Sequence, residues 1–305
     1  MALPLGFSPV GLATFVLLTF VICTTVNTFA MEAAVLFVPA FLFVYPEIVP
    51  AFPNVPLQAA IGLALFVELF GYSSSVAAYW FRGQVDLDTV KAILAVSVPV
   101  AVLGRATSYL APPALLKILF GGMLLVLSAI LFETHREGSS IPDWLTHPRF
   151  ARIMPERDER AERTDGGVTI SRFDWFDRTI AALGGAMAGL VGIAIGELSQ
   201  TLLTVRKRVP IRLSTGTSAF VLHGTIIAAL TTNLVLLQYG PSWLSGHSFS
   251  VPFGFGLVAG TTCLVGGQAG AFLNSRIPEE RTIQAMTVVY SLVGAFTILR
   301  ILFLG

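Results

Sequence analysis

Two glutamates in apolar surroundings are the residues of this sequence best suited to chemistry. Glu32 follows the apolar stretch that begins near Val10, and Glu197 has the corresponding place after the apolar stretch from Thr179. Carboxylates in long apolar segments are rare, and they usually face a cavity, a charged partner or a proton pathway. We therefore predict that both take part in proton coupling or gating. The alternative is that each caps the free N–H groups of the next helix at a membrane interface.

Three further ionisable residues lie in later apolar segments. Glu68 and His223 occupy nearly equivalent places in the two halves of the chain, and Arg105 follows Gly104. We predict that Glu68 and His223 belong to the proton pathway, because imidazole titrates near neutral pH. A histidine flanked by apolar residues also fits a packing role. Arg105 is either the counter-charge for an anion or a residue that extends its head group to the membrane interface.

A run of small polar residues, Thr215, Gly216, Thr217 and Ser218, follows Pro210. Hydroxyls and unpaired N–H groups at a helix start bind anions, and glycine permits close backbone approach. We predict that this run binds the substrate at the start of a broken helix; the alternative is close helix packing. The other candidate substrate-binding residues are the equivalent glycine of the first half and four polar residues near the two glutamates: Gly62, Thr25, Asn27, Ser199 and Gln200.

The composition of the chain determines what kind of elements hold these residues. Of the 305 residues 54% are hydrophobic and only 12% are charged, whereas about a quarter of a soluble domain is charged. A spanning helix needs about 20 apolar residues. The sequence therefore predicts an all-α, multi-pass membrane protein with about ten apolar segments: Val10–Ala30, Ala33–Phe52, Leu57–Trp80, Val90–Leu110, Ala114–Phe132, Thr179–Gly196, Leu198–Val205, Leu213–Leu237, Val251–Leu273 and Ile283–Leu304.

The second segment of each half is irregular. Leu198–Val205 is too short to span a bilayer, and prolines interrupt Ala33–Phe52. Interruptions at corresponding places predict broken or re-entrant helices. We divide the chain into a first membrane repeat (1–132), a polar linker (133–178) and a second membrane repeat (179–305).

Repeated prolines and glycines relate the two halves. Pro56 and Gly62 match Pro210 and Gly216, and the spacing of Gly104 and Pro112 recurs in Gly270 and Pro278. Basic residues concentrate in the linker and in alternate turns, which predicts that these face the cytoplasm. Equivalent turns then lie on opposite sides of the membrane. The prediction is two inverted five-segment repeats in the cell membrane, with a cytoplasmic linker and both termini outside.

Several classes of function lack support in the sequence. There is no phosphate-binding loop with its lysine, no nucleophile–base pair at a useful spacing and no cluster of Cys and His ligands. Cys23 and Cys263 both lie in apolar runs, which makes a disulfide framework unlikely. The net charge of +1 does not indicate a nucleic-acid partner. We expect no enzyme activity, no cofactor and no metal; a homo-oligomer is compatible with the sequence.

The paired pattern resembles the sulfite exporter TauE/SafE family of membrane permeases. The resemblance rests on Pro56 with Gly62, on Pro210 with Gly216-Thr217-Ser218, and on the two later glycine–proline pairs, and it covers the chain except the linker. It implies a membrane transporter of sulfite or other sulfur-containing or organic acid anions. In the first half, Ile61 and Leu63 flank the glycine where the family pattern has hydroxyls.

Together these observations predict a secondary transporter. It would export a small sulfur-containing anion, such as sulfite or an organosulfonate, by alternating access of the two repeats in the lipid bilayer, coupled to protons. The alternatives are an anion channel, or a membrane sensor or scaffold that acts through the linker.

Overall fold

A computed structural model of the chain describes residues 4–29, 31–136, 162–164, 167–169, 173–207, 209–239, 251–274 and 276–304. In chain order its elements are η1 (Pro4–Gly6), α1 (Pro9–Thr28), α2 (Ala34–Pro39), η2 (Ala40–Val44), α3 (Tyr45–Ile48), α4 (Leu57–Phe81), α5 (Leu87–Ser108), α6 (Pro113–Arg136), β1 (Glu162–Thr164), β2 (Gly167–Thr169), α9 (Trp175–Val191), α10 (Ile195–Thr201), η3 (Leu202–Arg206), α11 (Ile211–Tyr239), α13 (Phe253–Asn274) and α14 (Glu279–Leu304). Apart from the antiparallel pair β1–β2, every regular element in the described ranges is helical.

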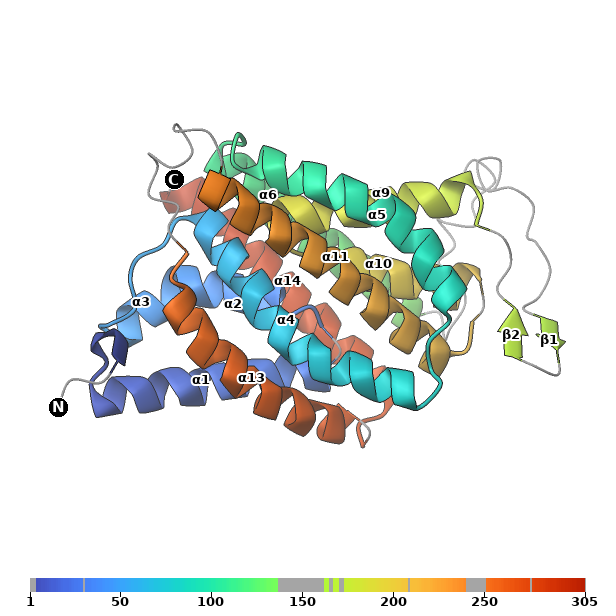
Figure 1. The fold of residues 1–305 in the computed structure, drawn as a ribbon, viewed down its shortest axis with the longest axis horizontal. Coiled ribbons are helices and arrows are strands. Elements are labelled where there is room, and N and C mark those ends of the chain that lie inside the picture. The colour runs from blue at the N-terminus through green and yellow to red at the C-terminus, as the bar shows by residue number, and fades with distance from the viewer. Residues whose placement is uncertain are drawn as a thin grey trace.

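Long apolar helices dominate the molecule (Figure 1). Within the described ranges, six helices are long and apolar enough to cross a membrane, and they lie in α1, α4, α5, α6, α11 and α14. At about 1.5 Å per residue, the 20 residues of α1 span roughly the thickness of the hydrocarbon core. The prediction of an all-helical, membrane-spanning architecture is confirmed.

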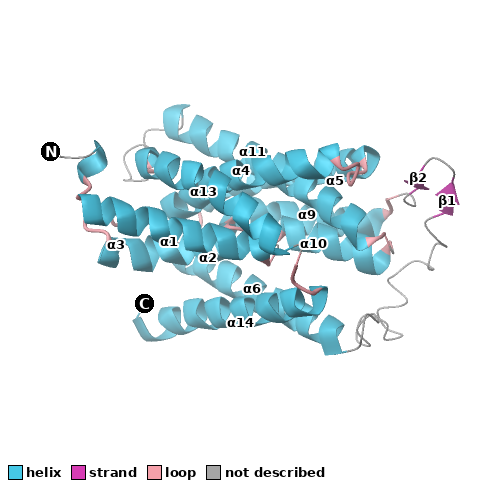
Figure 2. Cartoon of the chain, turned by 90° about the horizontal axis from the view of Figure 1, so that it is seen from below, coloured by secondary structure: helices cyan, strands magenta, loops and turns pink. Residues whose placement is uncertain are grey.

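Helices from the two halves of the chain pack against each other in matching pairs. Helix α1 packs on α13, and α5 packs on α9; α4 packs on α13, and α11 packs on α5. The helices of the third apolar segment of each half, α4 and α11, contact each other. The last helices of the two halves, α6 and α14, also contact each other. The α6–α14 pair lies along one side of the bundle (Figure 2). Each of these contacts between the halves has a counterpart in which the halves exchange places.

Glycines allow the helices of these pairs to approach closely. A Cβ atom at Gly189 of α9 would overlap the carbonyl oxygen of Ala101 in α5, and a Cβ at Gly104 would lie 2.8 Å from the carbonyl oxygen of Ala186. A Cβ at Gly270 of α13 would overlap the side chain of Asn27 in α1. Small residues at close crossings are the usual means of packing helices in membranes.

The second segment of each half is broken, as the prolines and the short length predicted. In the first half α2 passes into the five-residue π-helix η2 directly after Pro39, and in the second half α10 passes into the five-residue π-helix η3. A proline inside a helix removes one backbone hydrogen bond and thereby favours such a local change of pitch. The second half contains no proline at its π-helix, so we have no sequence explanation for η3.

One predicted boundary differs in the structure. The segment expected to run from Thr179 to Gly196 ends at Val191, because Gly192 adopts a left-handed conformation with φ +81° and caps α9. Ala194 also has a positive φ, of 90°. The short helix α10 then starts at Ile195, so Glu197 lies in the first turn of a new helix and does not end the previous one.

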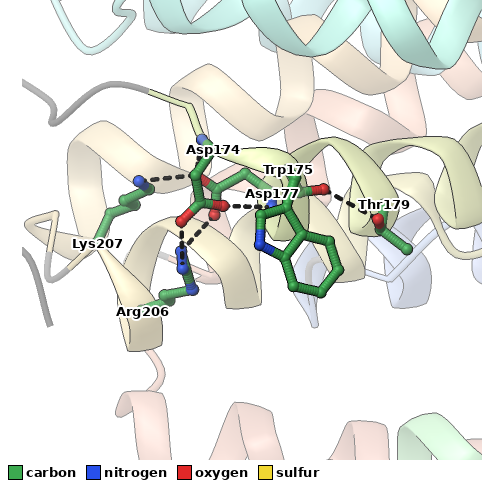
Figure 3. Close-up of polar contacts among 6 residues, drawn as sticks. All are labelled: Asp174, Trp175, Asp177, Thr179, Arg206 and Lys207. Atoms are coloured by element: carbon green, nitrogen blue, oxygen red, sulfur yellow. Dashed lines mark hydrogen bonds and ion pairs between the residues drawn. The ribbon is translucent and has the colours of Figure 1, made fainter. Parts of the chain in front are cut away.

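Helix α9 begins with a cluster of ion pairs (Figure 3). Asp174 and Asp177 form a reciprocal capping box, which explains why α9 starts before Thr179, inside the stretch predicted as linker. Arg206 at the end of η3 lies 2.6 Å from carboxylate oxygens of both aspartates, and Lys207 lies 2.7 Å from Asp177, which is completely buried. These pairs fix the end of the broken helix to the start of α9. Apart from β1 and β2, the linker between Arg136 and Phe173 lies outside the described residues.

Candidate functional site

Three carboxyl side chains meet where the broken helices of the two halves approach each other. Glu32 directly precedes α2, Glu68 lies in the middle of α4, and Glu197 lies in the first turn of α10. Their exposed fractions are 1%, 1% and 7%. Of the four residues predicted for proton coupling, the structure brings these three together.

The carboxyl group of Glu32 caps the short helix of the other half. The N–H of Gly196 donates to Oε1 of Glu32 at 2.5 Å, and the N–H of Ala194 donates to Oε2. The first N–H groups of a helix have no partner within the helix and carry its positive dipole end, so a carboxylate stabilises them. Glu32 therefore caps a helix start, as the alternative expected. The capped helix belongs to the other half of the chain, and the contact is buried in the interior.

Glu197 makes the return contact. Its Oε1 accepts a hydrogen bond from the N–H of Glu32 at 3.3 Å and another from the hydroxyl of Tyr290 in α14 at 2.5 Å. Its Oε2 is buried and has no hydrogen-bond partner. Each of the two glutamates thus accepts a hydrogen bond from the backbone at the start of the other's short helix.

Glu68 completes the group from α4. Its Oε1 accepts a hydrogen bond from the N–H of Ala33 at 2.8 Å, and its buried Oε2 has no partner. One turn further along α4, the hydroxyl of Tyr72 donates to the carbonyl oxygen of Met31 at 3.1 Å. Side chains of α4 and α10 therefore hold the backbone from Met31 to Ala33.

This carboxyl group cluster has no basic partner. In the described ranges, no Lys, Arg or His forms an ion pair with Glu32, Glu68 or Glu197. Burial in a medium of low dielectric disfavours charge, and neighbouring like charges disfavour it further. The arrangement suits the uptake and release of a proton.

His223 has no hydrogen bond to this cluster in the described residues. It is half-buried on α11, and its Nδ1 has no hydrogen-bond partner.

The run from Thr215 to Ser218 does not lie at a helix start. Helix α11 begins at Ile211, so the N–H groups of the run bond within the helix and are not free for an anion. A Cβ at Gly216 would overlap the carbonyl oxygen of Gln84, and Thr217 Oγ1 accepts a hydrogen bond from the N–H of Asp86 at 3.0 Å. Both contacts join α11 to the turn between α4 and α5. Ser218 donates to the carbonyl of its own helix at Thr215.

The other predicted substrate-binding residues are spread over several elements. Gln200 Nε2 donates to Thr215 Oγ1 at 3.1 Å, which brings α10 and α11 together. Thr25, Asn27 and Ser199 each donate to a backbone carbonyl of the preceding turn, at 2.8, 2.8 and 3.0 Å. Of this set, only Gln200 and Thr215 contact each other through their side chains.

Arg105 is completely buried at the contact of α5 with α4 and α11. Its Nε donates to Oδ1 of Asn233 at 2.9 Å, and its Nη2 donates to the carbonyl oxygen of Gln58 at 2.8 Å. Gly62 lies beside this contact, because a Cβ there would be 3.3 Å from Nη2 of Arg105 and 3.0 Å from Nδ2 of Asn233. The side chain of Arg105 is therefore enclosed by helices and does not extend to the molecular surface; its role as the counter-charge for an anion stays a prediction.

Comparison with known proteins identifies the family of the chain. The family model described as "Sulfite exporter TauE/SafE" matches residues 15–297. The chain belongs to the sulfite exporter TauE/SafE family. It is 23% identical to the "Probable membrane transporter protein YunE" of Bacillus subtilis (strain 168). The 271 aligned residues cover 89% of this chain and 91% of that protein. No solved structure matches the chain.

Membership in the TauE/SafE family agrees with the resemblance found in the sequence, and it makes the chain a multi-pass membrane transporter. Sequence reasoning did not find Tyr290 or Tyr72 beside the carboxyl groups, nor Asn233 beside Arg105. Tyr290 and Asn233 contact partners far away along the chain, so no local spacing marks them, whereas Tyr72 follows Glu68 by one helical turn. A polar residue in an apolar helix was the one available signal, and Asn233 shows it.

Proposed function

We propose that this TauE/SafE protein is a proton-coupled secondary transporter that exports a small sulfur-containing anion, such as sulfite or an organosulfonate. The family description supports the class of substrate. The reciprocal contact between Glu32 and Glu197 is the observation that carries the mechanism. It joins the short helices of both halves through groups whose charge depends on a bound proton.

A proton changes the hydrogen bonds that this contact can make. Ionised Glu32 accepts from the N–H groups of Gly196 and Ala194 with its two oxygens. Protonation converts one oxygen into an O–H donor and removes the charge that favours the positive end of α10. The cap weakens, and the starts of α2 and α10 can separate. Opening and closing at this place would expose the transport path to alternate sides of the membrane.

Substrate contact is proposed at the polar side chains between α10 and α11. Gln200 and Thr215 supply an amide and a hydroxyl there, with Thr217 and Ser218 on the same stretch of α11. We assign the linker and the turn between α4 and α5 to the cytoplasmic side because they hold much of the basic charge. The start of α9 lies at the end of the bundle opposite to the two chain ends (Figure 1). Arg206, which follows Gln200 along the chain, binds Asp174 at the start of α9. The Gln200–Thr215 contact would therefore face the cytoplasm.

The proposal is tested by transport in liposomes. Purified protein is reconstituted, and sulfite flux is measured with and without a pH gradient for wild type, Glu32→Gln and Glu197→Gln. The exposed Glu47 provides the matched control Glu47→Gln. We expect that the gradient accelerates flux in the wild type and the control, and that both buried variants lose this acceleration. Equal flux and equal pH response in Glu197→Gln and wild type would refute the coupling role.

The concentration dependence of the same flux separates a transporter from a channel. A transporter binds its substrate in each cycle, so its flux saturates as the sulfite concentration rises. Flux that stays proportional to concentration and ignores the pH gradient would assign the protein to the channel class instead.

A further inference from the structure

Arg105 is a buried cation without an anionic partner. Its side chain is completely buried, and in the described ranges no carboxylate forms an ion pair with it. The groups around it are neutral: the amide of Asn233, the carbonyl of Gln58 and the ring and hydroxyl of Tyr109. An uncompensated charge in the apolar interior of a membrane protein is costly. Such residues generally mark a pathway for ions or substrates.

Two hydrogen-bond donors at this place are unused. Nη1 of Arg105 and Nδ2 of Asn233 are both buried and have no partner. The Oδ1 atom of Asn233 accepts from Nε and Nη2 of Arg105 and from the hydroxyl of Tyr109, so the amide nitrogen is left as a donor. Gly62 has no side chain to cover that nitrogen. The unused groups are therefore all donors, next to one positive charge.

The Arg105 cluster lies between the halves of the chain and apart from the Gln200–Thr215 contact. Arg105 and Gly62 come from the first half, and Asn233 comes from the second. At about 1.5 Å per residue, Asn233 lies about 27 Å from Thr215 along α11, and Gly62 lies about 9 Å from Glu68 along α4. One small anion cannot contact both ends of α11. The carboxyl cluster lies between them along the helix axes.

We propose that Arg105 and Asn233 form a second binding site, for a compact oxyanion with one negative charge, at the end of the pathway near the chain termini. The inference rests on the proposed function only for the class of ligand. The guanidinium supplies the charge and Nη1 a donor, and Asn233 supplies Nδ2. Gly62 lies directly against them, because a Cβ there would be 3.0 Å from Nδ2 of Asn233. An anion that has passed the carboxyl cluster would be held here before release.

The test uses a substitution that cancels the charge without changing the shape. Asn233→Asp keeps an acceptor oxygen for Arg105 and replaces the unused donor by a carboxylate oxygen, so the cluster becomes neutral. Asn54→Asp adds the same charge at an exposed loop position and is the matched control. The full-length protein in detergent is titrated with sulfite, sulfoacetate and acetate, and binding is followed by thermal shift and by calorimetry.

We expect that Asn233→Asp unfolds at the same or a higher temperature than wild type without ligand. Its affinity at the Arg105 site should be at least tenfold weaker, so that calorimetry finds one bound anion fewer per chain while the Gln200–Thr215 contact still binds. Asn54→Asp should bind like wild type. Wild-type affinity in Asn233→Asp would overturn the proposal and leave Arg105 a structural link between α4, α5 and α11. If Asn233→Asp does not fold, Arg105→Lys decides: it keeps the charge but loses the planar set of donors, and unchanged affinity would again overturn the proposal.

The outcomes also separate this inference from the proposed function. Sulfite transport with unchanged binding in these variants would refute the second site and leave the transporter in place. Binding of acetate that depends on Asn233, without any transport of sulfur-containing anions, would support the site and refute the proposed substrate.

Discussion

Oε1 of Glu32 accepts a hydrogen bond from the N–H of Gly196 at 2.5 Å, while Oε1 of Glu197 accepts one from the N–H of Glu32 at 3.3 Å. Each half of the chain thus provides the carboxyl group that holds the short helix of the other. At the start of α2, Glu68 adds a contact from the same half by accepting from the N–H of Ala33. Hydrogen bonds of Glu32 and Glu197 thus join the starts of the two broken helices, α2 and α10, to each other.

This relationship predicts strong coupling between the two glutamates. Glu32→Gln and Glu197→Gln should each abolish acceleration by a pH gradient, and the double variant should be no worse than either single variant. Residues in one network typically show interaction energies of about 0.5–3 kcal/mol. The measurement is a double-mutant cycle on thermal stability and on sulfite flux in liposomes. Additive effects on both would show that the glutamates act independently.

Tyr290→Phe tests whether the hydroxyl beside Glu197 takes part. The variant removes the donor at 2.5 Å from Glu197 Oε1 and leaves the ring. We expect a loss of stability of about 0.6–1.5 kcal/mol and, if Glu197 couples transport to protons as proposed, a changed dependence of flux on pH, because the hydrogen bond between Tyr290 and Glu197 is lost. Tyr239→Phe, at an exposed position of α11, is the control. A wild-type pH profile in Tyr290→Phe would restrict this tyrosine to packing.

The close contact of α5 and α9 predicts a sharp difference between two glycines. A Cβ at Gly189 would overlap the carbonyl oxygen of Ala101, whereas a Cβ at Gly122 would have no atom within 4 Å. Gly189→Ala should destabilise the protein by about 1–3 kcal/mol, as overpacking usually does. Gly122→Ala should be neutral or slightly stabilising, because alanine favours the helix. Thermal unfolding in detergent measures both, and equal stability of the two variants would contradict the close contact.

Two ion pairs of different burial give a further matched comparison. Asp177 is completely buried and pairs with Arg206 and Lys207, whereas Asp88 and Lys91 form an exposed pair. Removing one partner of a buried pair costs about 3–5 kcal/mol, and an exposed pair contributes about 0–1 kcal/mol. Asp177→Asn should therefore unfold at a clearly lower temperature than Asp88→Asn. Added salt should diminish only the small effect at Asp88, and a similar stability of the two variants would argue against the cluster at the start of α9.

The apolar segments could be predicted from the sequence because the bilayer imposes a length and a composition on each of them. The helix α5 and the broken segment around Pro39 follow from hydropathy and proline alone. The end of α9 could not be found in this way. The left-handed conformations of Gly192 and Ala194 depend on how α10 is held by Glu32, which lies in the other half of the chain.

The site was predictable in its charged members and not in their partners. A carboxylate such as Glu68 stands out in an apolar sequence, whereas a tyrosine such as Tyr290 is common in membrane helices. The run around Gly216 was assigned to a helix start because Pro210 precedes it, yet α11 already begins at Ile211. A glycine in such a run can serve close helix packing or close contact with a ligand. The sequence does not distinguish these two roles, because the difference lies in the atom opposite the glycine. For Gly216 that atom is the carbonyl oxygen of Gln84, which indicates packing.

The close glycine contacts determine which parts of the molecule can move as rigid bodies. Gly270 brings α13 against α1, and Gly189 brings α9 against α5, so each tight pair contains one helix from each half. A rotation of residues 1–132 as one block against 179–305 would have to break both pairs. In the alternating access proposed above, each rocking body would combine helices of both halves: α1 and α13 with α4 in one body, and α5 and α9 with α11 in the other. A crosslink between α1 and α13 would leave transport intact, whereas one between α4 and α11 would stop it.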